Sequence, residues 1–172
     1  MRFVLKVLLA ALTMFALLAA PGRAGEVETA LLRGYLGNWA GAGVLVGGDQ
    51  PEQFTCRLKV TGGRQEKVNY AGRCSLVNMN LSVTGTISYN DKAARYEATM
   101  RSNVGFSAAA VGQKKGKAIT FVLNERQSDR GGNQMEIGSV LKLDARGITV
   151  DFSVEFNNSG QVLTTTVPFG RQ

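Results

Sequence analysis

Hydrophobic and polar residues alternate along most of this chain. In one polar-flanked stretch the apolar positions are Phe54, Cys56, Leu58 and Val60, and beyond a turn they resume at Val68, Tyr70, Gly72 and Cys74. A period of two is typical of β-strands with one buried face. Folding the chain about residue 65 brings Cys56 opposite Cys74. Because a slip of one residue would turn every side chain to the wrong face, the pattern sets the register and predicts a cross-strand disulfide.

The same alternation predicts about ten strands, joined by short turns that carry Gly, Asn or Asp. They span residues 39–46, 52–61, 67–77, 81–89, 94–101, 104–111, 118–124, 134–143, 148–156 and 161–167. Two further hairpins predict that Ile87 faces Tyr96 and that Leu141 faces Val150. A meander of this length closes on itself to remove its exposed edges. We therefore expect an all-β fold, a single antiparallel up-and-down barrel of about eight to ten strands.

Two segments precede the barrel. Residues 1–24 combine Arg2 and Lys6 with an apolar run over 7–20 and small residues at Gly22 and Ala24, which predicts a secretory signal peptide cleaved after Ala24. A retained membrane anchor is the alternative, but the run is shorter than the roughly 20 residues that a spanning helix needs. Residues 25–36 have the spacing of a short amphipathic helix, and residues 37–172 form the barrel domain.

Charge and cysteine content bear on compartment and partners. The full chain has a net charge of +7, and without the three basic residues of the signal it keeps 17 basic against 13 acidic residues. This excess is modest and argues against a nucleic-acid partner. Two cysteines in an exported chain form one disulfide most simply, so we expect a periplasmic or secreted protein.

Candidate catalytic chemistry is sparse. The chain contains no histidine, which excludes Ser-His and Cys-His nucleophilic sites, imidazole metal ligands and proximal-histidine haem binding. The pattern assigns every carboxylate of the exported part, Glu125 included, to the helix, a turn or the outward face, so no buried acid pair is expected. Tyr70 and Met100 could ligate haem in principle, but core packing explains both. We expect no enzymatic activity, no metal and no cofactor.

The inward positions mix bulky and small residues. The small ones are Gly72, Gly85, Ala98, Ala108, Ala110 and Ser139. A barrel of this size either packs solid, with small residues making room for bulky neighbours, or encloses one small ligand. Both interpretations stay open. If there is a cavity, its candidate wall residues are Phe54, Tyr70, Met100, Phe106 and Phe121.

The segment Leu36-Gly-Asn-Trp-Ala-Gly-Ala-Gly43 resembles the Gly-x-Trp opening of calycin barrels, which include lipocalins, avidins, fatty-acid-binding proteins and nitrobindins. The resemblance implies that Gly37 and Trp39 close the base of the barrel behind a short helix. The sequence of this motif is most similar to that of nitrobindin-type barrels, which bind haem through a histidine that this chain lacks. A Trp followed by two cysteines is also similar, over a shorter domain, to periplasmic metalloprotease-inhibitor barrels.

These observations favour an exported soluble barrel that binds a small apolar or amphipathic ligand in its interior. The alternative is an envelope interaction protein, or an inhibitor-like factor, that acts through its rim, with Lys114, Lys115 and Arg130 as candidate contacts. A third interpretation is a small outer-membrane barrel, in which the apolar phase would face lipid and the polar phase would line the lumen.

Overall fold

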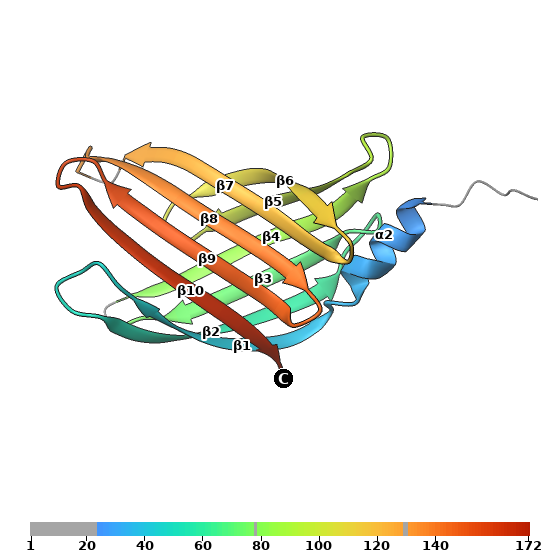
Figure 1. Ribbon diagram of the computed structural model, residues 1–172, viewed down its shortest axis with the longest axis horizontal. Helices are drawn as coiled ribbons and strands as arrows, with labels where there is room; N and C mark the ends of the chain where they lie inside the picture. The colour runs from blue at the N-terminus through green and yellow to red at the C-terminus, as the bar shows by residue number, and fades with distance from the viewer. Residues whose placement is uncertain (1–23, 78, 129–130) are drawn as a thin grey trace, which may run out of the picture.

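The computed structural model describes residues 24–77, 79–128 and 131–172, which form one helix and ten strands (Figure 1). The elements are α2 (Ala24–Arg33), β1 (Gly37–Leu45), β2 (Glu52–Gly62), β3 (Val68–Ser75), β4 (Asn80–Asn90), β5 (Arg95–Ser102), β6 (Ser107–Lys115), β7 (Ala118–Ser128), β8 (Gln134–Asp144), β9 (Gly147–Phe156) and β10 (Gln161–Arg171). Residues 1–23 of the predicted signal peptide lie outside the described residues. Ala24, its expected last residue, begins α2.

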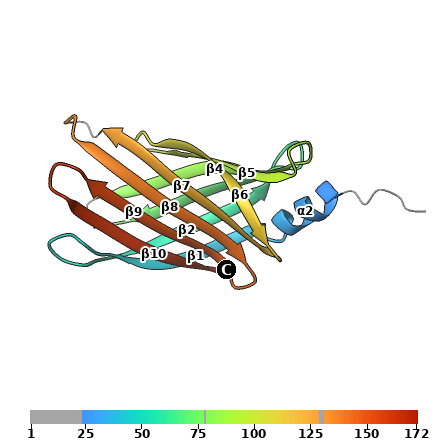
Figure 2. The same ribbon diagram turned by 45° about the horizontal axis from the view of Figure 1, so that its top comes forward.

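The strands form a closed antiparallel barrel in which each strand pairs with the next and β1 pairs with β10. This confirms the predicted all-β meander and the short helix in front of it. Figures 1 and 2 show α2 at one end of the barrel, with the turns that follow β1, β3, β5 and β9 at the other end. We call the α2 end the base and the other end the mouth.

The predicted hairpin about residue 65 is confirmed. Cys56 pairs with Cys74 across β2 and β3, and the two side chains form a disulfide. The predicted pairing of Leu141 with Val150 is also confirmed.

The predicted pairing of Ile87 with Tyr96 is wrong by two residues. Ile87 pairs with Ala98, because β4 continues to Asn90 and the turn occupies residues 91–94. Ala94 takes a positive φ of 48° in that turn. A shift of two residues keeps every side chain on its predicted face.

Two strands extend beyond their predicted bounds. β6 begins at Ser107, after a turn at residues 103–106, and continues through the basic run to Lys115, which pairs with Ala118. β7 continues to Ser128, so Glu125 lies in a strand and not in a loop. Glu125 pairs with the buried Ile137 and therefore occupies the inward phase, contrary to the expectation that every carboxylate lies outside.

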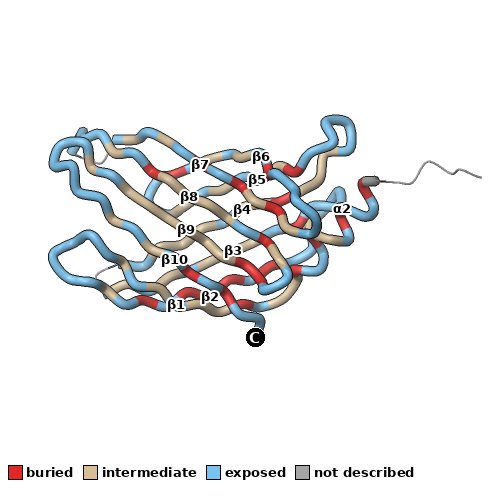
Figure 3. Tube along the Cα trace, in the orientation of Figure 1, coloured by how far each residue is buried: buried red, intermediate tan, exposed pale blue. Residues whose placement is uncertain are grey.

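The apolar phase of the strands points into the barrel, as in the soluble arrangement and unlike the outer-membrane alternative. Buried residues are most frequent in the half of the barrel next to α2, and the turns at the mouth are exposed (Figure 3). A smaller buried group of Phe106, Leu123 and Ile137 lies under β6 to β8.

The base is closed by the segment that the Gly-x-Trp resemblance pointed to. Trp39 is 5% exposed, and its Nε1 donates a hydrogen bond to the Tyr35 carbonyl at 2.9 Å. The Arg171 guanidinium lies 4.5 Å from the centre of the Trp39 ring, a cation–π contact, and donates hydrogen bonds to the carbonyls of Gly34 and Leu36. Gly37 has a φ of 138°, which favours glycine, and a Cβ there would lie 2.8 Å from Arg171 Nη1.

One charged cluster ties the helix to the wall. The Glu28 carboxylate of α2 accepts hydrogen bonds from Lys114 Nζ at 2.6 Å and from the Tyr96 hydroxyl. Burial by itself raises the pKa of Glu28, but the hydrogen bonds from Lys114 and Tyr96 and the charge of Lys114 outweigh it, so this pKa lies below its usual range. Burial and the bond to Glu28 raise the pKa of Tyr96. The cluster therefore holds an ionised Glu28 against β5 and β6.

We predict that Glu28→Gln lowers the free energy of unfolding by about 1 to 3 kcal/mol, because Lys114 and Tyr96 lose a charged acceptor. Since the pKa of Glu28 is lowered on folding, its contribution is complete above the ordinary pKa near 4.5 and is lost as pH falls through the folded-state value. Urea unfolding at pH 7 and pH 3 measures both effects. The control is Glu66→Gln, because the Arg33–Glu66 pair is exposed and should change stability little. Equal effects of the two substitutions at pH 7 would contradict this assignment.

We predict that the double substitution Cys56→Ala and Cys74→Ala leaves a folded barrel that is about 2 to 4 kcal/mol less stable, since the bridge closes a loop with a sequence separation of 18. Thermal melting with and without reductant provides the measurement. The reductant should lower the melting temperature of the natural chain and leave that of the double variant unchanged. A natural chain insensitive to full reduction would show that the disulfide contributes nothing to stability.

Candidate functional site

The interior of the barrel is hollow over part of its length. A cavity of about 230 Å³ lies inside it and receives inward-facing side chains from β2 to β5 and from β8 to β10. Several of these side chains are only half-buried although they point inward, because part of their surface borders the void. Val83, Leu141, Val150 and Phe152 are examples. The sequence left open whether the barrel interior is packed solid or encloses a cavity. The barrel is packed at the base and hollow beyond it.

The two ends of the cavity differ. At the base it is bounded by Leu32 of α2, by Tyr35, and by Leu143 and Ile148, which are all buried. Toward the mouth it reaches Leu76, Leu81 and Val104, and Val104 is 55% exposed. Access from outside is therefore expected at the mouth.

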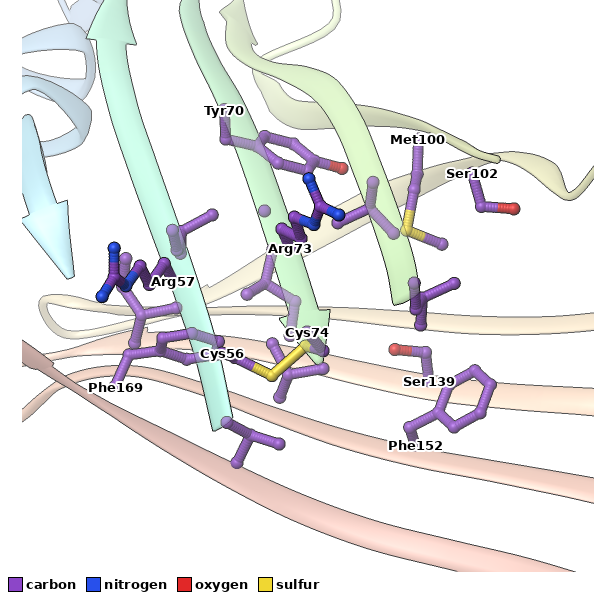
Figure 4. Close-up of a pocket in the computed structure, with 18 of the residues that line it drawn as sticks. Cys56, Arg57, Tyr70, Arg73, Cys74, Met100, Ser102, Ser139, Phe152 and Phe169 are labelled. Atoms are coloured by element: carbon purple, nitrogen blue, oxygen red, sulfur yellow. A yellow bond between two sulfur atoms is a disulfide. The ribbon is translucent and has the colours of Figure 1, made fainter. Parts of the chain in front are cut away.

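The disulfide is part of the cavity wall. Cys56 and Cys74 both border the void, and Figure 4 shows their bond linking β2 to β3, with Phe152 and Ser139 on strands behind them. Met100 approaches from another strand, and its sulfur lies among the residues that line the cavity. The disulfide therefore links two strands of the wall that borders the void.

Four of the five predicted wall residues line the cavity, namely Phe54, Tyr70, Met100 and Phe106. The fifth, Phe121, is 3% exposed and does not line it. Its ring packs over Gly112, where a Cβ would lie 2.6 Å from Phe121 Cε1. Phe121 is therefore a core residue, and the sequence pattern could not separate the two roles because both positions face inward.

The small inward residues divide in the same way. Gly72 and Ser139 border the cavity, whereas the ring of Tyr70 fills the space above Gly85. The Tyr70 hydroxyl donates a hydrogen bond to the Thr99 carbonyl at 2.8 Å. Burial raises the pKa of Tyr70 to about 12, so its phenol stays protonated at neutral pH and acts as a fixed donor.

Polar atoms are few in the lining. Ser102 Oγ accepts a hydrogen bond from the Phe106 N–H at 3.0 Å, and Ser139 Oγ donates one to the Asp151 carbonyl at 3.2 Å. Thr165 Oγ1 is buried and has no hydrogen-bond partner among the described residues. Arg57 and Arg73 border the cavity from outward register positions, and both side chains are exposed. No carboxylate is among the lining residues within the described parts of the chain.

The predicted rim cations do not gather at the mouth. Lys114 binds Glu28 at the base, and the exposed Lys115 lies at the adjacent turn into β7. Arg130 lies outside the described residues. Within those residues no group of His, Cys, Asp or Glu side chains could hold a metal ion. None of the helices in the described part of the chain is long and apolar enough to cross a membrane.

Comparison with known proteins supports the fold alone. No protein-family model matches the chain, and no curated protein sequence matches it. Among solved structures it is similar to Rv2717c from M. tuberculosis, with a TM-score of 0.62 and 15% sequence identity over 89% of this chain and 98% of that one. A likeness of this kind is consistent with a calycin-like barrel, and it says nothing about a ligand.

We predict that Thr165→Val raises the free energy of unfolding by about 1 kcal/mol, because valine keeps the shape of threonine and removes a buried hydroxyl that has no partner. Chemical denaturation measures the change. The control is the neighbouring Thr166→Val, which removes a hydrogen bond from Thr166 Oγ1 to Asp151 Oδ1 and should not stabilise. A destabilised Thr165→Val variant would mean that the hydroxyl has a partner in solution.

Proposed function

We propose that this chain is an exported binding protein, without catalytic activity, that holds a small apolar or amphipathic molecule inside its barrel. One observation carries the proposal, namely the void of about 230 Å³ bordered by half-buried apolar side chains that face inward. An apolar wall of this kind favours ligands by area removed from water, at about 25 cal/mol per Å².

The position of the polar atoms indicates which part of a ligand would lie where. The base half of the cavity offers Leu32, Leu143 and Ile148, which suit a hydrocarbon or ring system. A polar end would point toward the mouth, where the cavity opens near Ser102 and Val104. An amphipathic molecule would therefore enter with its apolar end first.

The absence of a catalytic role belongs to the proposal as well. Tyr70 and Tyr35 are the phenols that border the cavity, and burial raises the pKa of both, so both stay neutral. A cavity lined by protonated phenols and by two serine hydroxyls that already form hydrogen bonds offers no base to activate a nucleophile. Export is supported by the disulfide, since such bonds persist in oxidising compartments.

We predict that the natural chain binds the neutral apolar probe N-phenyl-1-naphthylamine with enhanced fluorescence, and that Val150→Trp weakens binding at least tenfold. Val150 borders the cavity, so the added ring would occupy the void. Val122→Trp is the matched control, because Val122 is 55% exposed on the outer wall and its replacement leaves the void unchanged.

Native mass spectrometry of the protein purified from its own envelope supplies a second readout. The expected result is a bound mass on the natural chain and on Val122→Trp, and its loss from Val150→Trp. Failure of the folded natural chain to bind the probe, together with no co-purified mass, would overturn the proposal.

A further inference from the structure

Exposed apolar side chains gather at the mouth. Nine large apolar residues are exposed among the described residues, and six of these lie at the mouth end, namely Val44, Val46, Val77, Met79, Val104 and Val162. We call these six the apolar rim. Exposed apolar groups that cluster in one region mark an interaction surface, whereas single ones scattered over a surface need no explanation.

Hydrogen bonds hold part of this rim in place. Asn103, in the turn after β5, donates from Nδ2 to the Asn80 carbonyl at 2.9 Å and accepts at Oδ1 from the Ser82 N–H at 2.8 Å. These bonds fix the β5–β6 turn, which carries Val104, against the start of β4, where Met79 precedes Asn80. The exposed valine and methionine are thus presented by an ordered framework.

The outer wall formed by β2 to β5 is basic. Arg73 and Arg101 lie near the mouth ends of β3 and β5, and Arg57 and Lys59 lie further from the mouth on β2; all four are exposed, and we call them the basic wall. The strand register places the four side chains in two adjacent rows on the outer face. Arg57 pairs directly with Arg73. Lys59 and Arg101 lie in the next row, because Lys59 pairs with Ala71, Ala71 with Thr84, and Thr84 with Arg101. No described carboxylate forms an ion pair with any of the four.

On the opposite wall the charges are mostly paired. Glu136, Asp151 and Glu155 occupy outward positions on β8 and β9, and Glu136 pairs directly with Glu155. Cations on that side are matched to carboxylates, as in Arg126–Glu136 and Lys142–Asp151. Because the basic wall carries unpaired cations and the cations of the opposite wall are paired, an anionic surface would turn the basic wall toward itself.

We propose that the mouth docks on an anionic lipid bilayer, with the basic wall against the headgroups and the apolar rim entering the interface. Unpaired cations match the charge of such a surface, and exposed valine and methionine side chains match the apolar layer beneath it. A soluble polyanion would use the cations and leave the apolar rim in water. The docking geometry does not require a ligand in the cavity, although it places the cavity opening at the bilayer.

Co-sedimentation with vesicles tests the proposal. The natural chain should bind vesicles of phosphatidylcholine mixed with phosphatidylglycerol, and binding should fall as salt rises and be much weaker to phosphatidylcholine alone. The triple variant Arg57→Gln, Arg73→Gln, Arg101→Gln should lose roughly 100-fold in partitioning, because each cation near the surface contributes about fivefold.

The matched control removes the same number of charges elsewhere. Arg95→Gln, Lys142→Gln, Arg146→Gln removes three cations that are each paired with a carboxylate, and it should keep vesicle binding. For the rim, Met79→Ser with Val104→Ser should weaken binding roughly tenfold, whereas Val111→Ser with Val122→Ser, on the outer wall, should not.

The outcomes separate the possible partners. Equal loss in the two triple variants would overturn the proposal, because only net charge would matter. Binding to heparin with no binding to either vesicle would overturn it in favour of a soluble polyanion. The single variant Arg101→Gln, whose side chain does not border the cavity, should lose about fivefold in vesicle partitioning and bind N-phenyl-1-naphthylamine as the natural chain does, so a failure of docking is distinguishable from a failure of the cavity.

Discussion

The structure depends on one constraint, which is the two-residue alternation carried without a break around a closed ladder of strands. Each strand pairs with the next, and β10 returns to β1, so the inward or outward phase of one strand sets that of its neighbours. The pairing of Cys56 with Cys74 is one rung of this ladder. Because a single slip would expose an entire apolar set, the register is also what keeps the interior apolar and the outer wall polar.

The interior is packed differently at the two ends of the barrel. At the base, Trp39, Tyr35 and the helix fill the barrel, and Arg171 covers the indole ring and the carbonyls beside it. Beyond this plug a void remains beside the smaller packed group of Phe106, Leu123 and Ile137, and the disulfide spans part of the wall that lines the void. A closed base and a hollow mouth give the barrel a direction, and the exposed residues of the apolar rim lie at the mouth end.

The fold was largely predictable, because period-two patterns and turn residues are local signals. The pairings of Cys56 and Leu141 followed from them, whereas the register of Ile87 did not, since the positive φ at Ala94 moved the turn. The site was predictable only in part. The pattern identifies inward residues, but whether Phe121 packs on Gly112 or borders a void depends on side-chain volumes brought together from distant strands. The Glu28–Lys114 pair is equally non-local, so a basic run that looked like a free turn is engaged with the helix.

The central claim is that the interior beyond the plug is an apolar void. A crystal structure of the protein under xenon pressure tests this most directly, because xenon enters apolar cavities that exclude water. The account predicts xenon density inside the barrel beside the Cys56–Cys74 bridge, within contact of Met100 and Phe152, or density for a co-purified molecule in that place. A barrel in which those side chains have closed onto the disulfide, with no xenon inside it, would contradict the account.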